Sequence, residues 1–274
     1  MIDVRVWAPA PYETTETIGP GPAEALAGLL DTAPPGPELP PLWHWVHFLD
    51  RPAQKDLGPD GHPLAGHFLP PIPDRRRMFA GGRLSLRRPL RIGTAVTRRS
   101  ELASTELKHG RSGELLFVTV RHTFLDGTDG TELAVEEQDL VYRSGDPATR
   151  PAQPSYEPPE PPEQGDAPWT LAMTADPVLL FRFSALTYNA HRIHYDETYT
   201  TQVEGHPGLV VHGPLLAILC LELPRRAGHK VSRLSFRARS PVYAGQPFLA
   251  TGSPDGDLAI RAPGAVTAMT AGFS

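Results

Sequence analysis

Residues 183–196, with the sequence FSALTYNAHRIHYD, concentrate side chains that can move protons. Asn189, His191 and His194 lie within six positions of one another, and the flanking residues are apolar or aromatic. Imidazole titrates close to neutral pH, so a histidine in a pocket of this kind suits general acid/base catalysis. Histidines beside aromatic residues also occur as hydrogen-bonded core groups, and the cluster alone leaves both interpretations open.

A second segment that could take part in catalysis follows at residues 205–224, GHPGLVVHGPLLAILCLELP. The run predicts a loop and then an apolar helix that begins at Gly213 and Pro214, because proline fits the first helical turn. Backbone N–H groups at a helix start lack partners within the helix and lie at the positive end of its dipole. We therefore expect the histidine segment to move protons and the helix start to polarise a carbonyl oxygen.

Several motifs carry a resemblance to a known family. Residues 189–194, GLVVHG at 208–213 and RARSPVYAGQPF at 237–248 resemble the hydratase motif of the MaoC-like, hot-dog-fold enoyl-thioester hydratases and dehydratases. WHWVHFLD at 43–50, LGPDGHP at 57–63, FLPPIPDRRRMFAGG at 68–82, RPLRIG at 88–93 and VEEQDLVYR at 135–143 narrow the resemblance. The chain is similar to the branch of mesaconyl-C4-CoA hydratases and type 2 hydroxyacyl-thioester dehydratases, which are FAS1-like dehydratases.

The resemblance implies an α+β, double hot-dog fold, in which each half wraps a curved antiparallel sheet around a central helix. A length of 274 residues accommodates two such units. We expect an N-terminal unit at residues 1–143 that covers the substrate, a proline-rich linker at 144–168, and a C-terminal unit at 169–274 that carries the hydratase motif. The prolines and acidic residues of the linker exclude both helix and central strand.

Apolar runs and alternations between turn residues predict the strands. Residues 115–127 and 131–143 read as a hairpin with a turn at 126–130, preceded by a long strand that ends in a turn at 109–113. Further strands are expected at 231–240, 247–253 and 257–263. The order of helix followed by strands argues against a parallel βαβ sheet.

The resemblance also implies roles in the hydration of an α,β-unsaturated thioester. His194 would be the base that activates water, Asn189 would hold the water or the substrate, and the Gly213 N–H would bind the thioester oxygen. Related single hot-dog hydratases carry Asp where this chain has Asn189, and an amide cannot accept the catalytic proton. His191 either shares the acid role or donates a structural hydrogen bond.

Residues expected to bind the substrate or its coenzyme A are Tyr188, Arg192, His212, Arg237 and Arg239. A guanidinium suits carboxylates and phosphates, so Arg192 in the pocket would favour an acyl group with a free carboxylate. The basic clusters at 75–77, 225–226 and 237–239 are either surface ion pairs or ligands for CoA or phosphopantetheine phosphates. Glu136, Glu137 and Asp139 are expected to be surface charges of a strand, in a half that lacks a second hydratase motif.

Composition limits the other partners. A net charge of −5 disfavours nucleic-acid binding, and the apolar run at 215–223 is too short to cross a membrane. Cys220 is the only cysteine, which excludes an intrachain disulfide and favours a cytoplasmic location. We expect an acyl-CoA or an acyl-carrier-protein substrate, no metal or cofactor beyond the thioester carrier itself, and consider a homodimer.

Three alternatives belong to other classes. His191, His194, His206 and His212 have a spacing that superficially resembles zinc ligands. A thioesterase would share the hot-dog fold, although the chain lacks the GxSxG motif of serine hydrolases. A non-catalytic module that binds acyl thioesters is the third, because fold does not fix function.

Overall fold

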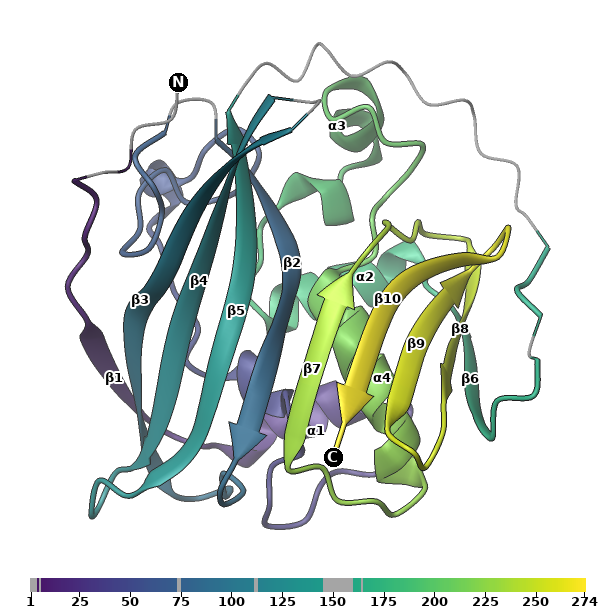
Figure 1. Ribbon diagram of the computed structural model, residues 1–274, viewed down its shortest axis with the longest axis horizontal. Coiled ribbons are helices and arrows are strands. Elements are labelled where there is room, and N and C mark those ends of the chain that lie inside the picture. The colour runs from purple at the N-terminus through teal and green to yellow at the C-terminus, as the bar shows by residue number, and fades with distance from the viewer. Residues whose placement is uncertain (1–3, 5, 73–74, 111–112, 145–159, 164) are drawn as a thin grey trace.

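The computed structural model describes residue 4 and residues 6–72, 75–110, 113–144, 160–163 and 165–274 (Figure 1). Within these residues, ten strands form one antiparallel sheet in the order β1-β3-β4-β5-β2-β7-β10-β9-β8-β6. The first half contributes β1 (Tyr12–Thr17), β2 (Arg75–Leu86), β3 (Ala95–Gly110), β4 (Gly113–Asp126) and β5 (Glu132–Ser144). The second half contributes β6 (Trp169–Thr174), β7 (Arg233–Ala238), β8 (Pro247–Gly252), β9 (Asp257–Ala262) and β10 (Val266–Phe273).

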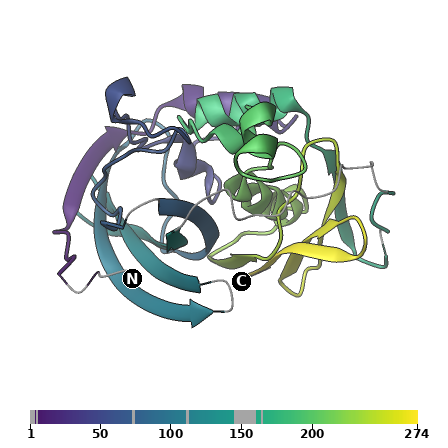
Figure 2. The same ribbon diagram turned by 90° about the horizontal axis from the view of Figure 1, so that it is seen from above.

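The two halves join where β2 pairs with β7, from Gly81 opposite Arg237 to Ser85 opposite Arg233. The sheet therefore continues without interruption from one half into the other. Seen from above, the sheet bends on both sides of this junction towards the helices, which lie together on one side of it (Figure 2). An antiparallel sheet with helices on one face is the α+β architecture that the order of elements predicts.

The predicted hairpin is confirmed by β4 and β5, which pair over almost their full length. Its turn is closed by Asp126, whose backbone N–H bonds to Thr131 O at 2.8 Å and whose carboxylate accepts from the Thr128 N–H at 2.9 Å. Aspartate favours such turns because its side chain can bond to the backbone two residues further on. Strand β1, in contrast, is polar in sequence and was not predicted.

The described helices are α1 (Pro20–Leu29), α2 (Pro177–Leu186), α3 (Glu197–Gln202) and α4 (Gly213–Arg226), with short 3-10 turns η1 (Trp43–Val46), η2 (Gln54–Asp56) and η4 (Arg192–His194). Helix α4 begins at Gly213 as predicted and is buried continuously from Leu215 to Pro224. It packs against strands β6, β8, β9 and β10 of the second half, and its buried residues 215–221 are all apolar. None of the described helices is long and apolar enough to span a membrane.

The first half has no comparable central helix among its described residues. Its sheet faces η1, whose Trp45 packs edge-on against Phe79 of β2 and Phe236 of β7. Helix α1 packs against α2 and η1 instead. The segment between α1 and η1 contains five prolines, and proline interrupts helices, so residues 30–42 form no helix.

The expected boundaries of the two units lie in the proline-rich segment at 144–168. Residues 145–159 and 164 of that segment lie outside the described residues. Ser144 is the last residue of β5, and Trp169 is the first residue of β6. The division into two units at these positions stays a prediction.

Candidate active site

The chain turns sharply after α2, and this turn, residues 187–194, carries the predicted catalytic side chains; it is called the histidine turn below. Thr187 ends α2, its hydroxyl donating to Phe183 O at 2.7 Å. Tyr188 adopts a positive φ of 51°, and the Asn189 N–H reaches back to Ser184 O at 2.8 Å. The turn continues into η4, and Asp196 caps the following helix α3 by accepting from the Tyr199 N–H at 2.9 Å.

His194 is held in one tautomer. Its ring is buried, and its Nδ1 bonds to the carbonyl oxygen of Val210 at 2.7 Å. A carbonyl oxygen can only accept, so Nδ1 carries the hydrogen and the neutral ring presents the lone pair of Nε2. Burial lowers the pKa of His194 to about 4, against the opposing effect of the Val210 hydrogen bond. At neutral pH, His194 is therefore a neutral imidazole with an unprotonated Nε2.

Two further imidazoles pack on His194. The ring of His212 stacks on it with centroids 3.6 Å apart, and His191 lies edge-on at 5.5 Å. His212 Nε2 is 2.9 Å from the Ser184 hydroxyl, which fixes its ring from the other side. Burial and neighbouring histidines push the pKa of His191 far below its usual value, and burial and His194 do the same to His212. The rings beside His194 are thus neutral at physiological pH.

Asn189 and Gly213 complete the predicted set. The Asn189 side-chain oxygen accepts from the His191 N–H at 3.0 Å, so its amide N–H₂ is the group that can hold water or substrate. Gly213 begins α4 immediately after the N-cap His212. A Cβ at Gly213 would lie 2.9 Å from Phe79 Cδ1, closer than side chains tolerate. Glycine therefore lets Phe79 approach the helix start directly.

A cavity of about 1490 Å³ opens between the two halves. Among the predicted residues, Tyr188, Asn189, His191, His194, Gly213, Arg237 and Arg239 line it. Arg237 and Arg239 are exposed, as is Tyr188 with 56% of its surface accessible, so solvent reaches these three side chains. The space is larger than most small-ligand pockets and accommodates an acyl group together with part of its carrier.

Two predicted binding residues do not line this cavity. His212 is buried behind His194. Arg192 donates to Asp196 Oδ2 from Nε at 3.0 Å and from Nη2 at 2.7 Å, and its guanidinium lies 4.0 Å from the Tyr199 ring centroid. Its Nη1 donates to Pro59 O at 3.0 Å. These contacts make Arg192 a link between the histidine turn and the first half.

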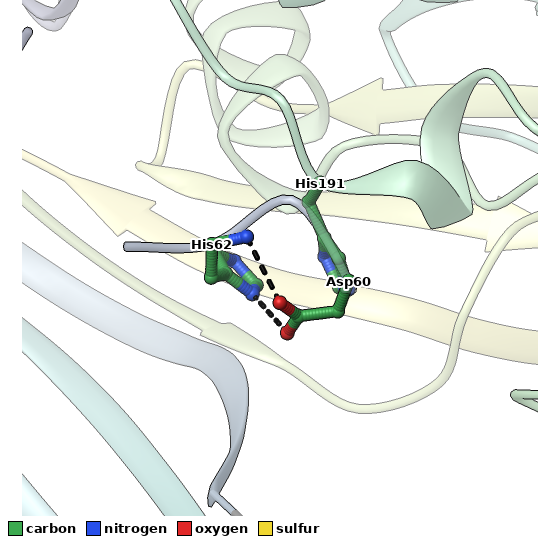
Figure 3. Close-up of side chains that lie close together, drawn as sticks. All are labelled: Asp60, His62 and His191. Carbon is green, nitrogen blue, oxygen red and sulfur yellow. Dashed lines mark hydrogen bonds and ion pairs between the residues drawn. The ribbon is translucent and has the colours of Figure 1, made fainter. Parts of the chain in front are cut away.

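The first half contributes polar groups whose roles the sequence did not reveal. Asp60 and His62, in the loop at 57–63, lie directly against His191 (Figure 3). Among the described residues, Asp60, His62 and His191 are also the acids and histidines placed to share a metal ion, with ligand atoms within 4.8 Å of one another. The zinc set considered from sequence spacing is different, because His194 and His212 are bonded to Val210 and Ser184.

The expectation that Glu136 is a surface charge of a strand is wrong, because its side chain is buried. It is 2% exposed, and its carboxylate accepts from Trp45 Nε1 at 2.6 Å and from Gln138 at 2.8 Å, and pairs with His44 at 2.7 Å. Burial opposes ionisation, but His44, His122 and Gln138 together lower the pKa of Glu136 to about 2. An ionised carboxylate thus lines the first-half side of the cavity.

Glu137 and Asp139, also expected at the surface, are half-buried and held in ion pairs. Glu137 pairs with Arg83 and Arg121, and Asp139 pairs with Arg83. Arg76 and Arg77, from the cluster at 75–77, line the cavity, and Arg76 Nη2 also lies 3.6 Å from a carboxylate oxygen of Glu204. Arg225 and Arg226 pair with the buried Glu222 of α4.

Comparison with known proteins identifies the family. Residues 42–244 match the family described as hydroxyacyl-thioester dehydratase type 2. The chain is 46% identical over 264 residues to the mesaconyl-C4-CoA hydratase of Chloroflexus aurantiacus, covering 91% of this chain and 90% of that protein.

Solved structures agree with the predicted fold. HtdX of Mycobacterium tuberculosis superposes with a TM-score of 0.64 at 17% identity, over 96% of this chain and 99% of that one. A second M. tuberculosis protein, described as having a double hotdog fold, gives a TM-score of 0.57 at 17% identity, over 97% of this chain and 95% of that one. The predicted double hot-dog fold is confirmed. The chain belongs to the type 2 hydroxyacyl-thioester dehydratase family and is a hydro-lyase of acyl thioesters.

Proposed function

We propose that this protein adds water across the Cα=Cβ bond of an enoyl-CoA, with mesaconyl-C4-CoA as its substrate, and that the histidine turn and the start of α4 form the active site. The observation that carries the site assignment is the fixed tautomer of His194. Its Nδ1–H is bound to Val210 O, which leaves Nε2 as a base in the same cavity as Asn189 and Gly213. A base within a hydrogen bond of water is the first requirement of hydration.

Three groups of the protein have catalytic roles in this reaction. His194 Nε2 takes a proton from water as the water oxygen attacks Cβ. The Asn189 amide N–H₂ orients that water or the acyl group. Electron density moves to the thioester oxygen, where the Gly213 N–H at the positive end of α4 stabilises the enolate. A proton delivered to Cα completes the addition.

The same site catalyses the reverse reaction, because every step is reversible. Removal of a proton from Cα and loss of hydroxide from Cβ would dehydrate a 3-hydroxyacyl thioester. The matched family is described as dehydratases, whereas the 46% identical relative is described as a hydratase. The concentrations of the two thioesters, and not the active site, therefore decide the net direction.

Of the six described arginines that line the cavity, four are assigned to the anionic parts of the substrate. Arg76 and Arg77 lie on β2, Arg237 lies on the neighbouring β7, and Arg239 follows β7. Guanidinium groups bind phosphates and carboxylates in a bidentate manner. We assign the exposed Arg237 and Arg239 to the CoA phosphates, together with stacking by Tyr188, and Arg76 and Arg77 to the free carboxylate of the acyl group.

Incubation of the purified protein with mesaconyl-C4-CoA and, separately, with crotonyl-CoA tests this proposal, with loss of the conjugated enoyl-thioester absorbance as the signal. We expect water addition to mesaconyl-C4-CoA. Turnover of crotonyl-CoA alone would replace the dicarboxylic substrate with a simple fatty-acyl one. Release of free thiol without water addition would indicate a thioesterase, and no reaction with either thioester would contradict a CoA-linked hydratase.

Three further expectations stay predictions. A carrier-protein substrate is tested by offering the same acyl group on phosphopantetheine. A homodimer is tested by the molar mass in solution. The cytoplasmic location is tested by cell fractionation.

A further inference from the structure

The loop at residues 57–63 brings an aspartate and a histidine from the first half into the active-site cavity (Figure 3). Asp60 Oδ2 lies 3.0 Å from His62 Nδ1, and Asp60 Oδ1 accepts from the His62 backbone N–H at 3.0 Å. The ring of His62 packs on that of His191 with centroids 3.9 Å apart. The ring of His191 therefore lies between the hydrogen-bonded Asp60–His62 pair and the proposed base, His194.

Three contacts hold the loop in this position. The Arg192 N–H donates to Asp60 O at 2.8 Å, and the Arg192 guanidinium donates to Pro59 O. Gly61 has a φ of +87°, and a Cβ at this position would lie 1.8 Å from Ala190 O. No side chain fits there, so a glycine is required for the loop to lie against the histidine turn.

The proposed hydration leaves one chemical task without an assigned residue. His194 can take the proton of water, but a second group must give a proton to Cα. The amide of Asn189 cannot transfer one, and His191 resists protonation because burial lowers its pKa far below the usual value. Glu136 also lines the cavity, but with a pKa of about 2 it holds no proton at neutral pH.

The Asp60–His62 pair has the properties that this task requires. Burial opposes ionisation of Asp60, but hydrogen bonds from the His62 side chain and backbone lower its pKa below the usual value. An ionised carboxylate that accepts from Nδ1–H orients the ring and stabilises the imidazolium. His62 Nε2 is then the atom that can carry a transferable proton into the cavity.

We propose that His62, oriented by Asp60, delivers the proton to Cα during hydration and removes it during dehydration. This inference rests on the proposed function. In hydration, His194 Nε2 takes one proton from water, the water oxygen bonds to Cβ, and the π electrons move onto the thioester as an enolate. The enolate then forms the Cα–H bond with the proton of His62 Nε2. Exchange with solvent returns a proton to His62 and removes one from His194, so that one water is added overall.

The geometry favours this role over a metal site. The His62 and His191 rings lie against each other with centroids 3.9 Å apart and an angle of 36° between their planes. Both Asp60 oxygens already face N–H groups of His62. A metal ion would have to displace these bonds.

The test compares His62→Gln with wild type in both directions of the reaction. We expect kcat to fall roughly 10²- to 10⁴-fold, the size of effect typical of a lost acid or base, with KM changed only a few fold. Dehydration of the Cα-deuterated hydroxyacyl thioester should show a larger primary isotope effect in the variant, because Cα proton transfer becomes slower. Imidazole should restore part of the activity of His62→Ala. A purely structural His62 would change neither the isotope effect nor the response to imidazole.

His109→Gln is the matched control, since His109 also lies near a carboxylate, Glu114, but outside the cavity. A second variant, Asp60→Asn, keeps the shape of the loop and tests the same role if the His62 variants do not fold. It should lower kcat and raise the isotope effect as His62→Gln does. Wild-type turnover matched by His62→Gln would overturn this inference alone. No wild-type turnover of either thioester would overturn the proposed function and this inference together. Activity lost to a chelator and restored by zinc would overturn it in favour of a metal site.

Discussion

At the scale of single residues, the hydrogen bond from His194 Nδ1 to Val210 O decides what the site can do. Burial keeps the ring neutral, with a pKa of about 4, so the base form persists well below neutral pH. We predict that the acid limb of kcat/KM caused by His194 lies near a pKa of about 4 and not near 6.5, the ordinary value for histidine. A pH profile, with circular dichroism to confirm folding at each pH, measures this. An acid limb near 6.5 in folded protein would contradict the assignment.

Gly213 is the residue whose backbone is assigned to the oxyanion. We predict that Gly213→Ala lowers kcat by roughly 10- to 10³-fold, because the added Cβ would meet Phe79 at 2.9 Å and move the helix start, and oxyanion donors contribute up to this range. Steady-state kinetics with the enoyl thioester measures the loss. Gly208→Ala is the control, since a Cβ there meets nothing within 4 Å and kcat should stay unchanged. Equal kinetics for both variants would contradict the predicted displacement of the helix start by the added Cβ.

Residues that are close in sequence were the predictable part of the site. Asn189, His191, His194 and Gly213 lie within 25 positions, and the structure brings them to one cavity. Asp60 approaches them only because the chain folds back from the first half, and no local pattern shows this. Glu136 lies in the polar run VEEQD, so nothing in the sequence indicates that it is buried and bonded to His44 and Trp45.

At the scale of elements, sequence patterns predicted α4 and the hairpin β4–β5 correctly, because burial produces long apolar runs and Asp and Gly mark the turn. Strand β1 escaped prediction because YETTET has no apolar alternation; it forms by pairing with β3, from Tyr12 opposite Ser100 to Thr17 opposite Ala95. Among the described residues, the element that faces the sheet of the first half is η1 and not a long helix.

Helix α4 also carries a buried charge whose removal should be costly. Glu222 is fully buried and pairs with Arg225 and Arg226 one turn later. We predict that Glu222→Ala lowers the free energy of unfolding by about 1–3 kcal/mol, because it removes charged hydrogen bonds and leaves both guanidinium groups without this partner. Urea denaturation measures the change. The exposed Glu24 of α1 provides the control Glu24→Ala, expected within about 0.5 kcal/mol of wild type. Equal stability of the two variants would show that the buried ion pairs contribute little.

At the scale of the whole molecule, one hydrophobic core extends through both halves. Trp45 of the first half packs on Phe236 of the second, and β2 pairs with β7. The cavity lies between the same halves, so its two walls are fixed by a shared core. Sequence alone predicted two units but could not show how closely they join, because the contacts connect residues far apart in the chain.

The molecule also buries many neutral histidines, which predicts acid sensitivity. Burial lowers the pKa of five of them, His47, His122, His191, His194 and His212. The unfolded chain takes up protons near pH 6.5, whereas the folded protein resists them until lower pH, so the unfolded state binds more protons in this window. The free energy of unfolding should therefore fall as the pH drops from 7 towards 4. Urea midpoints at pH 8 and pH 5 measure this, and an equal or higher midpoint at pH 5 would contradict it.

The rate of water addition to mesaconyl-C4-CoA in His194→Gln shows whether His194 is the base of an enoyl-thioester hydratase. We predict that kcat/KM falls by at least roughly 10²-fold while the circular dichroism spectrum stays that of the folded wild type. The control His229→Gln, an exposed histidine that packs on Trp169 away from the cavity, should keep the wild-type rate. A folded His194→Gln protein that hydrates the thioester at a rate within a few fold of wild type would show that His194 is not the base.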